Sequence, residues 1–235
     1  MMTINRRMKK HSLLLVVFSL LLFTTSQADE VVPFQYNDDN LLLPIPDGFC
    51  NATEELVGIF AIDFLNKQIS RGLKDMPEPV IVFTICGSEN NLEEMYPWGY
   101  IGLMKNFEPS ITQKAYNKML DTYLDSSEMM QELYELAEGA TISTVSEYGF
   151  DVNRIDYDEV TLVWTDENVA VISTTIGYFL EGEQFIENII GAGTTLNKTI
   201  VNYFITEIEN GVTIPIQNAS LLRLKAPSSD SCILY

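Results

Sequence analysis

Carboxylates are the only reactive side chains that this sequence holds in abundance. The 235 residues include 33 Asp and Glu against 14 Lys and Arg, which gives a net charge of −19, and a single histidine. Two sets of acids have the residue types of a site. They are Glu89, Glu93 and Glu94 ahead of Trp98 and Tyr100, and Asp151, Asp156, Asp158 and Glu159 together with Asn153. The first set has the acids and stacking rings that glycoside hydrolysis uses, and the second offers oxygen ligands for Ca²⁺.

Both sets also have simpler interpretations. A glycoside hydrolase needs two carboxyl groups about 5–10 Å apart across a cleft, and spacing along the chain does not establish that separation. The second set departs from the EF-hand pattern, because Ile155 occupies a ligand position and the required glycine is missing. We therefore expect the second set to form a solvated loop. A carboxylate-based hydrolase acting on glycans and a Ca²⁺-dependent module stay open as alternatives.

The first 28 residues have the layout of a secretory signal peptide. Four of residues 6–10 are basic (Arg6, Arg7, Lys9 and Lys10), and residues 13–23 are apolar except for one serine. Ser26 and Ala28 supply small residues at positions −3 and −1 of a cleavage site. The apolar run is too short to span a bilayer comfortably. We expect an exported protein, periplasmic or extracellular, with no stable membrane insertion after cleavage. An uncleaved N-terminal anchor is the alternative.

Removal of residues 1–28 changes the chemistry that is available. The segment takes away four of the 14 basic residues and no acid, so the mature chain of 207 residues has a net charge of −23. It also takes away His11, the only histidine, which excludes Ser-His-Asp and Cys-His catalysis and histidine metal sites. The remaining nucleophile design, Ser110 or Ser143 with Lys114 or Lys118, lacks the Ser-x-x-Lys motif. The negative charge argues against nucleic acid and anionic lipid as partners.

Three cysteines, Cys50, Cys86 and Cys232, all lie in the exported part of the chain. In an oxidising compartment two of them are expected to pair. We favour Cys50–Cys86 with Cys232 free, and leave the other pairings open. The 35 residues between Cys50 and Cys86 would close a loop worth about 3–4 kcal/mol on the chain-entropy model.

The hydrophobic pattern predicts an α+β fold in which an antiparallel β-meander sheet packs against one or two helices. Helical spacing runs from Leu56 to Ile69 and again from residue 109 to 139, with a break at Ser126–Ser127. Strands are expected over residues 41–49, 80–86 and 98–104, and the meander over 160–164, 169–180, 185–195 and 200–208. Gly191 and Gly193 indicate a bulge or close backbone packing.

The pattern also sets the expected domain limits. After the signal peptide we expect a flexible segment over residues 29–40, a single domain over residues 41–226 that ends in a short helix at 219–225, and a polar tail over residues 227–235.

One stretch carries a resemblance to known sequences. Leu43-Pro44-Ile45-Pro46-Asp47-Gly48-Phe49-Cys50 precedes a helix, an apolar strand that ends in Cys86, and the late meander. This arrangement resembles a loose group of uncharacterised exported bacterial proteins with a Leu-Pro-x-Pro-x-Gly-aromatic-Cys opening. The resemblance implies a disulfide between Cys50 and Cys86, and it supplies no activity, cofactor or catalytic residue.

These observations lead to one functional expectation. The chain is predicted to be an exported, acidic, non-enzymatic accessory or binding protein, whose partner is a protein or a small molecule. No catalytic residue, cofactor or metal ligand is assigned from the sequence.

Overall fold

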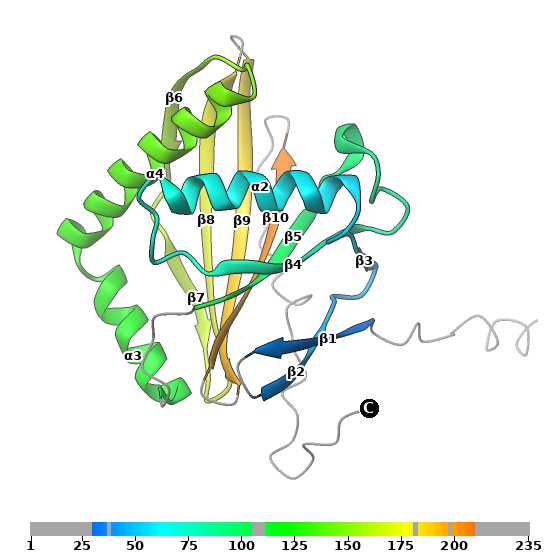
Figure 1. Cartoon of the computed structure of the whole chain (residues 1–235). Helices are drawn as coiled ribbons and strands as arrows, with labels where there is room; N and C mark the ends of the chain where they lie inside the picture. The colour runs from blue at the N-terminus through cyan, green and yellow to red at the C-terminus, as the bar shows by residue number, and fades with distance from the viewer. Residues whose placement is uncertain (1–29, 37–38, 105–110, 181–182, 197–198, 210–235) are drawn as a thin grey trace, which may run out of the picture.

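The computed structural model describes residues 30–36, 39–104, 111–180, 183–196 and 199–209 (Figure 1). Its main feature is an antiparallel sheet with the strand order β3–β4–β5–β10–β9–β8–β6, in which β7 also pairs with β8. Helices lie against this sheet, and β1 and β2 form a separate two-stranded hairpin. The α+β class, with an antiparallel sheet packed against helices, is therefore confirmed.

The elements have the following bounds. The strands are β1 Val31–Tyr36, β2 Asp39–Pro44, β3 Phe49–Asn51, β4 Glu78–Ile85, β5 Trp98–Leu103, β6 Val152–Tyr157, β7 Thr161–Thr165, β8 Ala170–Leu180, β9 Glu183–Leu196 and β10 Thr199–Glu209. The helices are α2 Leu56–Ser70, α3 Gln113–Leu124 and α4 Ser127–Glu147, with a single 3₁₀ turn η1 at Leu92–Glu94.

The core has two sides because the central strands are apolar on both faces. On one side, β4, β5 and β10 pack against the β1–β2 hairpin, whose Leu41 and Leu43 are fully or almost fully buried. On the other side, Val57 and Ala61 of α2 pack against Val82 and Tyr100. Every residue of β5 is buried, as a strand covered on both faces requires.

Strands β7, β8, β9 and β10 form the predicted meander. Consecutive strands pair antiparallel, and the Ala170–Leu180 strand pairs along its full length with β9. Strand β6 was not expected, since residues 151–159 were predicted to be a solvated loop. Val152 and Ile155 are both buried although their positions differ by three, because a register shift between Val152 and Arg154 brings both to the core. This bulge conceals the strand from a search for period-two alternation.

The helices begin and end close to where the hydrophobic pattern of the sequence predicted them, except at the end of α4. Ser126 caps α4, accepting a hydrogen bond from the Met129 N–H, so the predicted break between two helices is confirmed. Helix α4 continues to Glu147, beyond the predicted end at residue 139. Tyr148, which follows it, donates a hydrogen bond of 2.5 Å to Asp63 and thereby joins α4 to α2.

The N-terminal part of the domain is more ordered than predicted. Residues 29–40 were expected to be flexible, but Val31–Tyr36 forms β1 and pairs with β2. The side chains of β1 alternate between exposed and partly buried. None of them is fully buried, so the strand lacks the clear alternation of apolar and polar residues by which strands are predicted from sequence. The signal peptide, the 219–225 helix, the 227–235 tail and Cys232 lie outside the described residues. Within the described residues, no helix is long and apolar enough to cross a membrane.

Other residues pack closely against the backbone of β9 at Gly191 and Gly193, so close backbone packing, one of the two predicted explanations for these glycines, is correct. A Cβ atom at residue 193 would lie 2.2 Å from the Tyr116 hydroxyl oxygen, and one at residue 191 would lie 2.9 Å from the Phe204 ring. Tyr116 of α3 is buried and donates a hydrogen bond to Asn202 of β10. The two glycines therefore let α3 and an aromatic ring lie directly on the backbone of the sheet.

We predict that Gly193→Ala lowers the free energy of unfolding by about 1–3 kcal/mol, because the added methyl group has to displace the buried Tyr116 ring. Urea denaturation measures the change. Gly139→Ala is the matched control: no atom lies within 4 Å of a Cβ at that position in α4, so this variant gains about 0.5–1 kcal/mol. Equal midpoints for Gly193→Ala and the parent protein would contradict the packing described.

Candidate functional site

The structure separates the acids of residues 89–94 from the aromatic rings that follow them. Glu93 and Glu94 lie exposed on η1, whereas Trp98 and Tyr100 are 6% and 5% exposed in the core under α2. The Glu89 carboxylate accepts the N–H of Gly87 at 2.9 Å, and backbone hydrogen bonds, that of Gly87 first, hold the pKa of Glu89 below its usual value. These rings cannot stack on a sugar that also reaches the three acids.

The acids of residues 151–159 do not converge on one point either. Asp156 forms an exposed ion pair with Arg154 at 2.7 Å, and Asp158 follows the end of β6. Within the described residues, the one group of three potential metal-ligand atoms lying within 4.8 Å of one another is formed by Cys50, Cys86 and Glu89.

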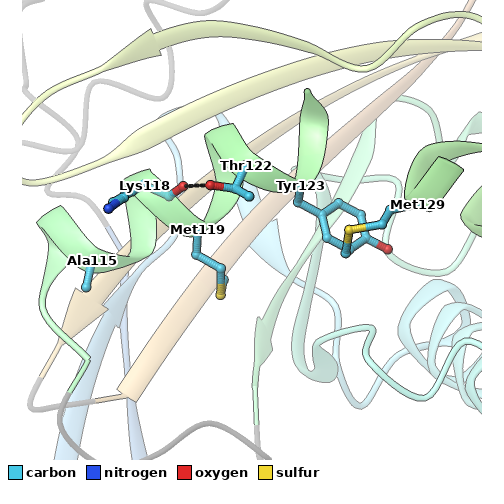
Figure 2. A pocket seen from close by; sticks show the side chains of 6 residues that line it. All are labelled: Ala115, Lys118, Met119, Thr122, Tyr123 and Met129. Atoms are coloured by element: carbon cyan, nitrogen blue, oxygen red, sulfur yellow. Dashed lines mark hydrogen bonds between the residues drawn. The ribbon is translucent and has the colours of Figure 1, made fainter. Parts of the chain in front are cut away.

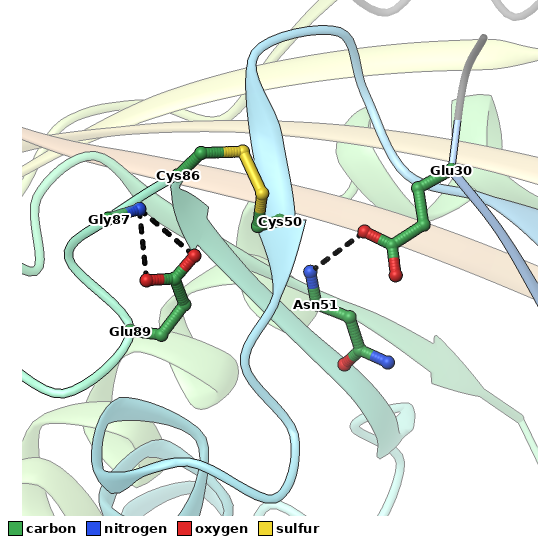
Figure 3. The surroundings of a disulfide bond; sticks show 6 residues. All are labelled: Glu30, Cys50, Asn51, Cys86, Gly87 and Glu89. Atoms are coloured by element: carbon green, nitrogen blue, oxygen red, sulfur yellow. Dashed lines mark hydrogen bonds between the residues drawn. A yellow bond between two sulfur atoms is a disulfide. The ribbon is translucent and has the colours of Figure 1, made fainter.

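Cys50 and Cys86 form the predicted disulfide, which joins the edge strand β3 to the end of β4 (Figure 3). Their Cα atoms lie 4.8 Å apart. Figure 3 shows Glu89 beside this bond, with its carboxylate turned to the Gly87 N–H. Because the two sulfur atoms are bonded to each other, they are not thiolate ligands for a metal ion. The group is therefore a structural link between β3 and β4.

The predicted serine and lysine pairs find no support in the geometry. Ser110 lies outside the described residues, and Ser143 is exposed on α4 without a hydrogen bond to Lys114 or Lys118 of α3. Lys118 instead lines a cavity of about 370 Å³ between α3 and the start of α4 (Figure 2). The other residues that line it are Ala115, Met119, Thr122, Tyr123 and Met129. This lining is mostly apolar and brings together no acid and base.

A different carboxyl, Glu187 of β9, lies on the helix-facing side of the sheet. Trp98 packs under α2, and it is the register partner of Thr206 on β10. Thr206 is in turn the partner of Ile189 on β9, so Glu187, two residues away, faces the same side. The Thr206 hydroxyl donates a hydrogen bond to the Glu187 carboxylate. Glu187 is thus fixed in the middle of the sheet by a neighbouring strand.

Aromatic rings continue the same face toward β8 and β6. Glu187 pairs with Ile176 of β8, which places Tyr178 of β8 on the same side of the sheet. The Tyr178 ring stacks on Phe185 with centroids 5.7 Å apart. Tyr157 of β6 also pairs with Ile176, and its ring stacks on Tyr134 of α4 at 5.5 Å. Unlike Trp98, these four rings are partly exposed.

We call this group of side chains the Glu187 cluster. It consists of Tyr96, Trp98, Tyr157, Tyr178, Glu187 and Thr206. The loop before β5 contributes Tyr96, and the sheet contributes the others. In Figure 1, β8 and β9 are long strands that extend past α2 on both sides, and α4 lies near β6.

Electrostatic conditions in the cluster are unusual for a protein surface. Burial raises the pKa of Glu187, and the hydrogen bond from Thr206 opposes that shift. Burial likewise raises the pKa of Tyr157, against a hydrogen bond with Thr141 that lowers it, and together with the charges of Glu138 and Glu187 brings it to about 12. Burial followed by the charge of Glu187 raises the pKa values of Tyr96 and Tyr178 above the usual value. The tyrosine hydroxyls therefore stay protonated and can donate hydrogen bonds.

Trp98 supplies one more donor. Its indole Nε1 is buried and has no hydrogen-bond partner of good geometry. A buried N–H without a partner is unfavourable by about 1–3 kcal/mol, and such groups are rare in folded proteins. The N–H lies beside the Tyr96 hydroxyl, close enough to lower the pKa of that phenol in opposition to the effect of burial. The cluster therefore contains a donor whose hydrogen-bonding capacity the fold leaves unused.

Sequence reasoning missed Glu187 for an identifiable reason. The residue stands in a β-rich segment among 33 acids, and its neighbours Trp98, Tyr178 and Thr206 come from other strands. A polar residue at an inward position of a predicted strand is the only local signal that was available. The sequence pattern indicated Trp98 as a candidate, but together with Glu89, Glu93 and Glu94 as its acids.

Comparison with known proteins gives no family. No protein-family model matches the chain, and no curated protein matches it in sequence.

The raised pKa of Glu187 predicts a pH-dependent stability. The unfolded carboxyl titrates near 4.5, so the folded protein binds this proton more tightly and loses stability as the pH rises from about 4.5 through the folded pKa. Glu187→Gln removes that loss. Its free energy of unfolding, relative to the parent protein, is therefore expected to be higher at pH 8 than at pH 4, by about 1.4 kcal/mol for each tenfold increase in proton affinity.

Glu89→Gln is the matched variant with the opposite sign. The pKa of Glu89 is lowered, so its stabilising effect is present above pH 4.5 and is lost as the pH falls through the folded value. Glu89→Gln is expected to lose stability at neutral pH relative to acid pH. Urea denaturation between pH 3 and pH 8 measures both variants, and parallel pH profiles for the two would contradict the assignment.

Proposed function

We propose that this protein is an exported, non-enzymatic binding protein that holds a small ligand on the aromatic face of the sheet around Glu187. The observation that carries this proposal is the position of one shielded carboxyl among partly exposed aromatic rings. Ligand sites commonly combine an apolar and aromatic lining with a few convergent polar groups. The Glu187 cluster has that composition, and its residues come from strands that pair with one another.

The surroundings of Glu187 favour binding over hydrolysis. A catalytic pair of carboxyls raises the pKa of one member through the negative charge of the other. The pKa of Glu187 responds instead to burial and to the Thr206 hydroxyl. Of the acids expected to form a pair near Trp98, Glu93 and Glu94 are exposed on η1, and Glu89 accepts a hydrogen bond from the Gly87 N–H. A single carboxyl with protonated phenols around it is suited to holding a polar group.

Export is part of the proposal, and two observations support it. Residues 1–28 have the pattern of a signal peptide, and the chain contains a disulfide between Cys50 and Cys86. Disulfides persist mainly in oxidising compartments outside the cytosol. The net charge of −19 makes nucleic acid an unsuitable partner.

Export is tested by expressing the full chain in a bacterial host and fractionating the cells. We expect the protein outside the cytoplasm, beginning at Asp29, with Cys50 and Cys86 protected from thiol labelling until a reductant is added. Intact mass and N-terminal sequencing measure these properties. A cytoplasmic protein that retains residues 1–28 and free thiols would refute export.

Binding is tested by ligand-observed NMR on the exported protein with four named probes at up to 10 mM. The probes are N-acetylglucosamine, phenylacetate, choline and 3,3-dimethylbutanol. We expect at least one to bind, and its affinity to fall at least tenfold in Glu187→Gln or Tyr178→Phe.

The matched control for the binding test is Tyr123→Phe, which removes a tyrosine hydroxyl at the cavity between α3 and α4. The control is expected to bind the probe as the parent protein does. The proposal fails if no probe binds. It also fails if Tyr123→Phe weakens binding while Glu187→Gln and Tyr178→Phe leave it unchanged, since the site would then be the α3–α4 cavity.

A further inference from the structure

We infer that the ligand of the Glu187 cluster is an organic ammonium ion, whose charge lies next to the Glu187 carboxylate and whose carbon atoms lie on the tyrosine rings. This inference rests on the proposed function, because it names the ligand class for the same site. Three properties of the cluster lead to it: the sign of the charges, the partly exposed aromatic side chains and the supply of hydrogen-bond donors.

The charges that act on the cluster are negative. Glu187 lies at its centre, and Glu138 of α4 acts on Tyr157 from the helix side. No lysine or arginine is among the causes that shift the pKa values of Glu187, Tyr96, Tyr157 or Tyr178. The whole chain adds a net charge of −19. A positive ligand is attracted to such a site and an anionic ligand is repelled by it.

The ring faces suit a cation. Two stacked pairs, Tyr178 with Phe185 and Tyr134 with Tyr157, lie along the same side of the sheet and are partly exposed. The face of an aromatic ring carries negative potential and attracts ammonium groups, by about 0.5–2 kcal/mol for each well-placed contact. Quaternary ammonium groups are held in this way because they cannot donate hydrogen bonds and depend on ring faces and carboxylates.

The donors around Glu187 suit its ionised form. The Thr206 hydroxyl already donates to the carboxylate, and this hydrogen bond lowers the pKa of Glu187 against the effect of burial. The Trp98 N–H is buried without a partner, and the tyrosine hydroxyls stay protonated. What the ionised carboxyl lacks among the described residues is a positive charge, since no lysine or arginine is among the groups that shift its pKa. A bound ammonium ion supplies that charge and lowers the pKa of Glu187, opposing the effect of burial.

The test compares a cation with its neutral carbon isostere. Choline and 3,3-dimethylbutanol have the same shape, but only choline carries a charge. With the exported protein at pH 7 and low salt, we expect choline to bind at least tenfold more tightly, measured by NMR titration and by Trp fluorescence. Glu187→Gln is expected to remove that tenfold preference and to leave the affinity for 3,3-dimethylbutanol unchanged.

Two further measurements separate a direct contact from a structural role. Calorimetry of choline binding at pH 5, just above the ordinary carboxyl pKa, in buffers of different ionisation enthalpy should show proton release for the parent protein and none for Glu187→Gln. Glu207→Gln is the matched control, because Glu207 is the next residue after Thr206 on β10 and faces the opposite side of the sheet. This variant should bind choline as the parent protein does.

The outcomes distinguish this inference from the function on which it rests. Equal affinity for choline and 3,3-dimethylbutanol, with both weakened by Tyr178→Phe, overturns the ammonium inference and leaves binding at the cluster standing. Binding of N-acetylglucosamine or phenylacetate at the cluster, without binding of choline, likewise overturns the ammonium inference and supports a binding site at the cluster. Failure of all four probes overturns both.

Discussion

The structure depends on one constraint: the central strands β4, β5 and β10 are apolar on both faces, so both faces of the sheet have to be covered. Every residue of β5 is buried, which no single layer of cover achieves. Helix α2 covers one face and the β1–β2 hairpin covers the other, and each has its own cluster of buried side chains. The disulfide between Cys50 and Cys86 joins the edge strand β3 to β4 at the end where the chain passes between the two covers.

The candidate site lies where α2 no longer covers the sheet. Strands β8 and β9 have 11 and 14 residues and extend past α2, so side chains on their helix-facing side stay partly exposed. A fold that only required stability would place apolar residues there. This chain places a carboxyl, Glu187, among tyrosines and beside an unpaired indole N–H. Such departures from the simplest packing are concentrated at functional sites, because a bound ligand can satisfy groups that the protein leaves unsatisfied.

Helix α3 packs against the sheet at a position where β9 has a glycine in place of a larger residue. Gly193 removes a side chain from β9 at the point where the Tyr116 ring lies, and the Tyr116 hydroxyl then reaches Asn202 on the next strand. The Gln113 side chain adds hydrogen bonds to the backbone of β9 at Gly193 and Thr195. These hydrogen bonds add to the apolar packing of Tyr116, Met119 and Leu120 against Ala170 and Ile200. Met119 and Met129 also line the cavity between α3 and α4.

The sequence by itself determined the features that depend on neighbouring residues. The four-strand meander, the break at Ser126 and the α+β class followed from period and turn residues, since hydrophobic burial imposes those periods locally. The sequence favoured the pairing of Cys50 with Cys86 but left the other pairings open, and the structure shows these two residues bonded. Only the tertiary structure decided which acid matters. Glu187 was not distinguishable among 33 acids, and Trp98 was grouped with the wrong carboxylates. The register between β5, β10, β9 and β8 brings Trp98, Thr206, Glu187 and Tyr178 together across up to 108 residues of chain. The register shift between Val152 and Arg154 likewise kept β6 from being predicted from the sequence. Strand register and bulges arise from pairing between distant segments, which is why local patterns do not contain them.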